Sequence, residues 1–157
     1  MRSIRKSNKG FTLIEILIVV IILGILASLV VAQFTNIRGN TADTALKDDL
    51  RWMRSAVFLY QAEHGALPSV SNFEAQMTEY TDMSGNASAT KDATYRLGSY
   101  MYSVPELPVG TQRGKTGVTG MTYAAGYGWR YDETNGSVLP NCTDSELDSN
   151  GVAYNTY

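Results

Sequence analysis

The longest apolar run lies near the start of the chain, where residues 11–32 contain a single charged side chain, Glu15. A helix rises about 1.5 Å per residue, so this run is about 33 Å long, enough to cross the hydrocarbon core of a membrane. A charge at that depth costs roughly 2.5 to 3.5 kcal/mol. We therefore expect a membrane-spanning helix in which the glutamate has a partner and a role.

A second helical pattern follows, in which apolar residues recur at spacings of three and four. Its members are Ala42, Leu46, Leu50, Met53, Val57 and Tyr60. These spacings place one apolar stripe along a helix, and Gly65 with Pro68 predicts its end near His64. The weak pattern at residues 36–40 leaves open whether the two helical segments are continuous.

The remaining residues predict a small sheet. Residues 69–94 are polar and indicate a variable loop with a short helix around 72–80. Expected strands are 121–125, 128–131 and 137–139, and Asn135-Gly136 indicates a hairpin between the last two. Trp129 and Tyr131 alternate with Arg130 and should share the core face. The sequence predicts an α+β fold, with the long N-terminal helix packed on a small antiparallel C-terminal sheet.

Charge is distributed unevenly along the chain. The first ten residues hold four of the 13 basic residues and none of the 15 acidic ones, which is typical of a segment that stays on the cytoplasmic side. The rest of the chain therefore carries a net charge of −6, which argues against nucleic-acid binding through a basic surface. Residues 33–157 suffice for one small domain.

The segment K-G-F-T-L-I-E, residues 9–15, resembles the processing site of the type IV pilin and pseudopilin family. In that family a prepilin peptidase cuts after the glycine and methylates the new amine. The resemblance implies a cleaved leader 1–10 that ends at Gly10, a methylated N-terminus at Phe11, and an assembly role for Glu15. That glutamate would neutralise the amine of a neighbouring subunit, and a buried pair is tolerable where each charge alone is costly.

The resemblance is strongest to the major pseudopilin and implies a structural subunit of a type II secretion pseudopilus, not an enzyme. Residues 11–32 would anchor the chain once in the bacterial inner membrane and form the filament core, with residues 33–157 as a periplasmic head. The filament would help push folded proteins out of the periplasm. Implied partners are further copies of the chain in a helical filament, other pseudopilins, an inner-membrane assembly platform and the peptidase.

Two alternatives stay open. The first is a type IV pilin of a surface filament used in adhesion, motility or DNA uptake. The lone Cys142 argues against it, because many type IV pilins carry a C-terminal disulfide. The second is a secreted enzyme or binding protein behind a signal peptide, with residues 30–32 as its cleavage site.

Chemistry-bearing residues are few. With one histidine and one cysteine, the chain cannot form a zinc site of ordinary composition, and it offers few candidates for a catalytic Ser-His-Asp or Cys-His arrangement. The G-K-T at 114–116 does not have the glycine spacing of a phosphate-binding loop. The tail gathers four oxygen-bearing side chains within seven residues, ahead of a glycine: Asp144, Glu146, Asp148 and Asn150. Such a set can bind calcium, and the alternative is a solvated acidic turn.

Overall fold

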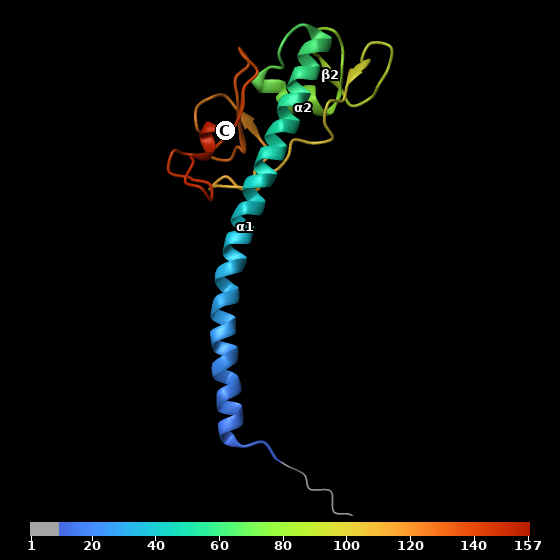
Figure 1. Cartoon of the computed structure of the whole chain (residues 1–157). Coiled ribbons are helices and arrows are strands. Elements are labelled where there is room, and N and C mark those ends of the chain that lie inside the picture. Colours follow the sequence, from blue (N-terminus) through green and yellow to red (C-terminus); the bar gives the residue numbers. More distant parts are fainter. Residues whose placement is uncertain (1–9) are drawn as a thin grey trace, which may run out of the picture. The chain divides into compact units, whose positions relative to one another are not determined.

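The computed structural model describes residues 10–157, and the side chains of all of these except 29–40 (Figure 1). The chain divides into two compact units, with the boundary between Arg38 and Gly39. Its elements are α1 (Leu13–His64), η1 (Val70–Asn72), α2 (Phe73–Thr78), β1 (Tyr80–Thr81), β2 (Ala87–Ser88), β3 (Leu97–Gly98), β4 (Val118–Thr119), β5 (Trp129–Tyr131), β6 (Val138–Pro140) and η2 (Tyr154–Thr156). The class is α+β, as predicted.

The first unit contributes the N-terminal part of α1, and the assignment of α1 continues through Gly39. Where side chains are described, no helix is both long enough and apolar enough to cross a membrane. The expected anchor, 11–32, extends into 29–32, whose side chains lie outside the described residues. Residues 1–9 of the expected leader lie outside them as well.

In the second unit, α1 presents its apolar stripe to the core, as the spacing predicted. Leu46, Leu50, Met53, Val57 and Tyr60 are all buried. The helix ends where the sequence indicated, because Gly65 adopts a φ of 69° and donates its N–H to the carbonyl oxygen of Gln61 at 2.8 Å. A left-handed glycine is a common helix stop, since it lacks the Cβ that disfavours this conformation.

The first sheet has the order β2-β1-β3 and is antiparallel. It lies partly within 69–94, which the sequence indicated as a loop with one short helix. The helix is confirmed as α2, but the loop prediction missed β1 and β2. Each of these strands is only two residues long, and their turn is held by Asp82, which accepts the N–H groups of Ser84 and Asn86.

The second sheet has the order β4-β5-β6. The predicted hairpin is confirmed, with β5 antiparallel to β6 and Gly136 at a φ of 79° in its turn. The strand predicted over 121–125 is wrong. Instead β4 occupies the other edge of β5, and it runs parallel, so the sheet is mixed.

A side chain explains why no strand forms over 121–125. Asn141 accepts the N–H of Ala124 through its Oδ1 at 3.4 Å, and its Nδ2 donates to the Ala124 carbonyl at 2.6 Å. The main chain of Ala124 therefore bonds to an amide side chain, where a strand would bond to a ladder partner. Asn141 itself is fully buried, so this arrangement is part of the core.

The core lies between the stripe of α1, α2 and the second sheet. Trp129 and Tyr131 are both buried, which confirms the predicted shared face. The ring of Tyr131 packs against Phe73 of α2, with 4.7 Å between centroids. Trp129 donates its indole N–H to the carbonyl oxygen of Pro105 at 2.8 Å, which ties the 99–109 loop to the sheet.

Candidate functional site

The N-terminal motif surrounds the first turn of α1. Gly10 and Phe11 precede the helix, and Thr12 caps it by accepting the N–H of Glu15 through Oγ1 at 3.3 Å. The carbonyl oxygen of Thr12 also accepts the N–H groups of Glu15 and Ile16. A threonine followed three residues later by a glutamate is the spacing of a capping box. The sequence reasoning missed this role of Thr12, which that spacing could have revealed.

The bond between Gly10 and Phe11 lies in non-helical backbone. Gly10 has open space around it, and the side chain of Phe11 is 78% exposed. A peptidase needs a reachable segment outside regular structure, and both conditions hold here. The roles of Gly10 and Phe11 in processing stay predictions.

Glu15 lies in the first turn of α1, where a carboxylate is favoured by the partial positive charge of the helix N-terminus. No ion pair of Glu15 exists among the described side chains. The carboxylate is thus compatible with the helix end and open to a partner from outside the chain.

The helix surface that follows Glu15 is apolar and exposed. Its large hydrophobic side chains are Leu13, Ile14, Ile16, Leu17, Ile18, Val19, Val20, Ile21, Ile22, Leu23, Ile25 and Leu26, and each is at least 47% exposed. A helix that is hydrophobic all round is stable only when something covers it, either lipid or other helices. Within the described residues the chain supplies no such cover.

The C-terminal loop is fixed to α1 by a buried carboxylate. Asp43 is only 4% exposed; its Oδ1 accepts the hydroxyl of Tyr154 at 2.7 Å and its Oδ2 accepts the N–H of Ser149 at 3.0 Å. Burial raises the pKa of Asp43, but these hydrogen bonds outweigh burial and hold the pKa below its usual value. Asp43 therefore remains ionised at neutral pH and anchors the loop.

The four residues expected to bind calcium do not point to one place. Glu146 accepts the N–H groups of Thr111 and Thr143, whereas Asp144 accepts the side-chain amide of Asn155. Asp148 accepts the Tyr157 hydroxyl and the N–H groups of Asn150 and Val152. Across the described side chains, no three His, Cys, Asp or Glu residues form a group that could hold a metal ion.

This donor set does not fit calcium as it stands, because its carboxylate oxygens already accept hydrogen bonds from the protein. Calcium needs six to eight oxygens directed at one point. Binding would require the loop to exchange its main-chain donors for the ion. Calcium therefore stays a prediction to be tested.

The single histidine and the single cysteine both have structural environments. His64 stacks on Tyr60 with 3.9 Å between ring centroids, and its Nε2 lies 3.0 Å from the carbonyl oxygen of Asp82. Cys142 is buried, and burial raises the pKa of its thiol to about 12. A thiol with that pKa is not a nucleophile at neutral pH.

Comparison with known proteins identifies the N-terminal motif. The prokaryotic N-terminal methylation motif matches residues 5–31. Type II secretion system core protein G of Vibrio cholerae is 31% identical over 111 residues, which are 70% of this chain and 70% of that protein. The Pseudomonas aeruginosa protein of the same name is 43% identical over 65 residues, 41% of this chain and 46% of that protein.

A fimbrial protein of Pseudomonas aeruginosa is 30% identical over 103 residues, which are 59% of this chain and 67% of that protein. No solved structure gives a significant match. The methylation motif, together with the similarity to core protein G over 70% of both chains, shows that the chain belongs to the type IV pilin and type II secretion pseudopilin family and resembles the major pseudopilin, core protein G.

Proposed function

We propose that the chain is a structural subunit of a type II secretion pseudopilus, in which copies assemble through α1 and help push folded proteins out of the periplasm. The observation that carries this proposal is the exposed apolar surface of α1 with one carboxylate, Glu15, in its first turn. Such a helix is stable in a membrane before assembly and against other copies afterwards. The similarity to core protein G supports the type of filament.

Processing at Gly10 would create the charge that Glu15 neutralises. The new amine of Phe11 would lie just before α1, where the helix N-terminus already carries partial positive charge. A second positive charge there is unfavourable unless a carboxylate lies close by. Glu15 of a neighbouring copy can supply it, and pairing offsets the cost of burying both groups in the apolar core of a filament.

The proposal places residues 11–32 across the inner membrane once, with residues 33–157 in the periplasm. The apolar run and the basic residues ahead of it support this orientation. Prepilin peptidase, an assembly platform and other pseudopilins are the partners that membership of the family implies. The role is structural, and no catalytic step is assigned to the chain.

A type IV pilin is the second candidate, and the similarity to the fimbrial protein of Pseudomonas aeruginosa favours it. Both candidates share processing and assembly through α1. The buried Cys142 favours the pseudopilin, since it has no intramolecular partner with which to form the disulfide of many type IV pilins.

Two substitutions test the assembly role. Glu15→Leu should leave the chain in the membrane but abolish filaments, because it removes the carboxylate and keeps the helix apolar. Ser28→Ala is the matched control: Ser28 donates its hydroxyl to the Ile25 carbonyl at 2.7 Å within the same helix, so it needs no outside partner. Filaments at wild-type yield from Glu15→Leu would refute the pairing.

Processing is measured in the same preparations. Intact mass of the membrane-extracted chain should show loss of residues 1–10, with or without a methyl group, and Gly10→Val should leave the precursor uncut. A mature chain that begins at Gln33 would instead indicate an ordinary signal peptide. A secreted enzyme or binding protein would predict that result.

A further inference from the structure

A groove of about 560 Å³ lies along α1 in the second unit. We call it the basic groove, and its lining residues are Lys47, Leu50, Arg51, Arg54, Ser55, Phe58 and Tyr157. Leu50 belongs to the core, whereas the ring of Phe58 is 70% exposed. The groove therefore combines three cations with an exposed aromatic side chain.

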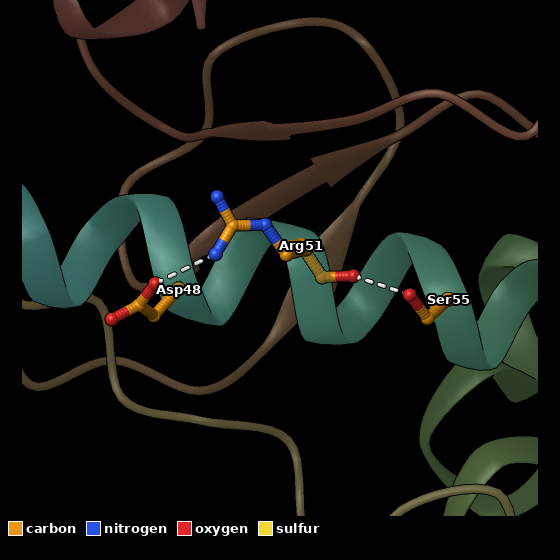
Figure 2. Close-up of polar contacts among 3 residues, drawn as sticks. All are labelled: Asp48, Arg51 and Ser55. Carbon is orange, nitrogen blue, oxygen red and sulfur yellow. Dashed lines mark hydrogen bonds and ion pairs between the residues drawn. The ribbon is translucent and has the colours of Figure 1, made fainter.

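Among the described side chains, one ion pair involves a cation of the basic groove. Arg51 pairs with Asp48 at 3.0 Å, and its carbonyl oxygen accepts the hydroxyl of Ser55 one turn later (Figure 2). Arg54 donates to main-chain oxygens, those of Val138 at 2.8 Å and Tyr157 at 2.6 Å.

The third cation, Lys47, lies over the Tyr157 ring with 5.0 Å from Nζ to the centroid. Of these three cations, only Arg51 forms an ion pair with a described carboxylate side chain, that of Asp48. These three basic side chains gather on a chain whose net charge is −2.

A second surface of the same unit has the opposite charge. The residues Ser71, Asn72, Glu74, Ala75, Thr78 and Glu79 line a surface cavity of about 340 Å³ along α2, which we call the acidic α2 face. Neither Glu74 nor Glu79 has an ion-pair partner among the described side chains, and no basic residue lines the cavity. The two surfaces share no residue, so both are available on one molecule.

We propose that the basic groove of one copy binds the acidic α2 face of the next copy. This inference rests on the proposed function, because a filament brings many heads together. Complementary charges fix the register and direction of a contact more than its strength. Two different patches that fit each other form a head-to-tail contact, which repeats into an open filament and does not close as a dimer.

Cross-linking of the full-length chain in cells that assemble filaments tests the contact. Phe58→Cys and Ala75→Cys place one thiol at each surface, and a short bismaleimide should join them between copies. Because every copy carries both thiols, the expected product is a ladder of dimers, trimers and longer species. The single variants should give no ladder, and the native chain should give none because Cys142 is buried.

Charge reversal provides the specific readout. In the two-cysteine chain, Lys47→Glu with Arg51→Glu should lower the ladder yield about tenfold or more, since like charges then face each other. Glu74→Lys with Glu79→Lys should do the same. All four substitutions together should restore the ladder, because the surfaces are again complementary. Failure of the fourfold variant to restore it would overturn the proposal.

Any other partner in the basic groove would give a different cross-linked product. A dimer from Phe58→Cys alone would show a symmetric contact, and a product of another mass would show a different protein in the groove; either overturns the proposal. A chain with Phe58→Cys and Tyr102→Cys is the matched control, because Tyr102 is exposed but lines neither surface. A ladder of equal yield from this chain would refute the assigned faces.

Filaments of the wild-type chain are collected by sedimentation in parallel. Filaments without the ladder would overturn this contact and leave the proposed function standing. Absence of wild-type filaments would overturn the proposed function, and this inference with it.

Discussion

Leu50→Ala tests the packing of α1 against the head. Leu50 is 2% exposed and lies in the middle of the buried stripe of α1. The substitution removes three carbons, and at about 0.8 kcal/mol for each buried CH₂ group the transfer loss alone is about 2.4 kcal/mol. The cavity left behind adds to this, so the expected loss of unfolding free energy is about 2 to 5 kcal/mol.

We expect the loss of unfolding free energy for Leu50→Ala in the lower half of this range. Leu50 lines the basic groove as well as the core, so neighbouring side chains at the surface can move into the space it leaves. Leu46 is fully buried and does not line the groove. Leu46→Ala should therefore cost at least as much as Leu50→Ala.

The assay is chemical unfolding of residues 33–157 followed by circular dichroism. Leu59→Ala is the matched control, because it makes the same change on the same helix at a residue that is 48% exposed. That control should stay within about 0.5 kcal/mol of the parent. Equal losses for Leu50→Ala and Leu59→Ala would refute the orientation of α1.

Three further predictions concern the C-terminal loop, and all are measured on the same fragment. Tyr154→Phe removes a donor to the buried carboxylate of Asp43 and should cost about 1.5 to 3 kcal/mol of unfolding free energy, whereas loss of less than a few tenths would exclude the anchor. Hydrogen bonds, first that of the Tyr157 hydroxyl and then those of the Val152 and Asn150 N–H groups, lower the pKa of Asp148 from 3.8 to about 2. The stabilising effect of the ionised carboxylate is therefore present above pH 3.8 and is lost as the pH falls toward 2. Asp148→Asn should flatten the acid-induced fall in melting temperature over that window, and an unchanged slope would contradict the assignment. Calcium binding predicts a higher melting temperature in millimolar calcium than in chelator, abolished by Asp148→Ala; identical curves would leave the tail as an acidic turn.

The sequence predicted the features that depend on periodicity over many residues. The apolar stripe of α1, the stop at Gly65 and the hairpin between β5 and β6 all follow from local pattern or turn chemistry, and the structure confirms them. The α+β class follows because a hairpin face and a helix stripe must cover each other.

The missed strands have a common cause. β1, β2, β3 and β4 are each two residues long, too short to show alternation, so their pairing depends on contacts distant in sequence. The false strand at 121–125 had strand-like composition, but Asn141 bonds to its main chain. No local signal in 121–125 reveals a partner located in a later segment.

The candidate sites show the same contrast between local motifs, which the sequence reveals, and contacts between distant residues, which it does not. The processing motif is contiguous, so sequence identified it, and even the missed cap at Thr12 has a local signature. The tail cluster is contiguous too, but proximity in sequence did not bring its carboxylates together, because turns direct neighbouring side chains to different donors. Asp43 is the opposite case: its partners are more than one hundred residues away, and no pattern marked it.

In the head, the apolar stripe of α1 and one of its carboxylates are buried, whereas the described apolar and acidic side chains of the N-terminal part of α1 are exposed. This difference explains how one chain can serve as a subunit. In the head, apolar residues of α1 are covered by the sheets, and a buried carboxylate is satisfied by the C-terminal loop. The N-terminal part of α1 has an apolar surface and an acidic first turn, and the described residues provide cover for neither. Lipid or other molecules can bury that surface, and a carboxylate near a helix start favours a partner that brings a positive charge. A copy cut after Gly10, as proposed, would carry that charge just ahead of the same helix, so each subunit would provide what the next one lacks.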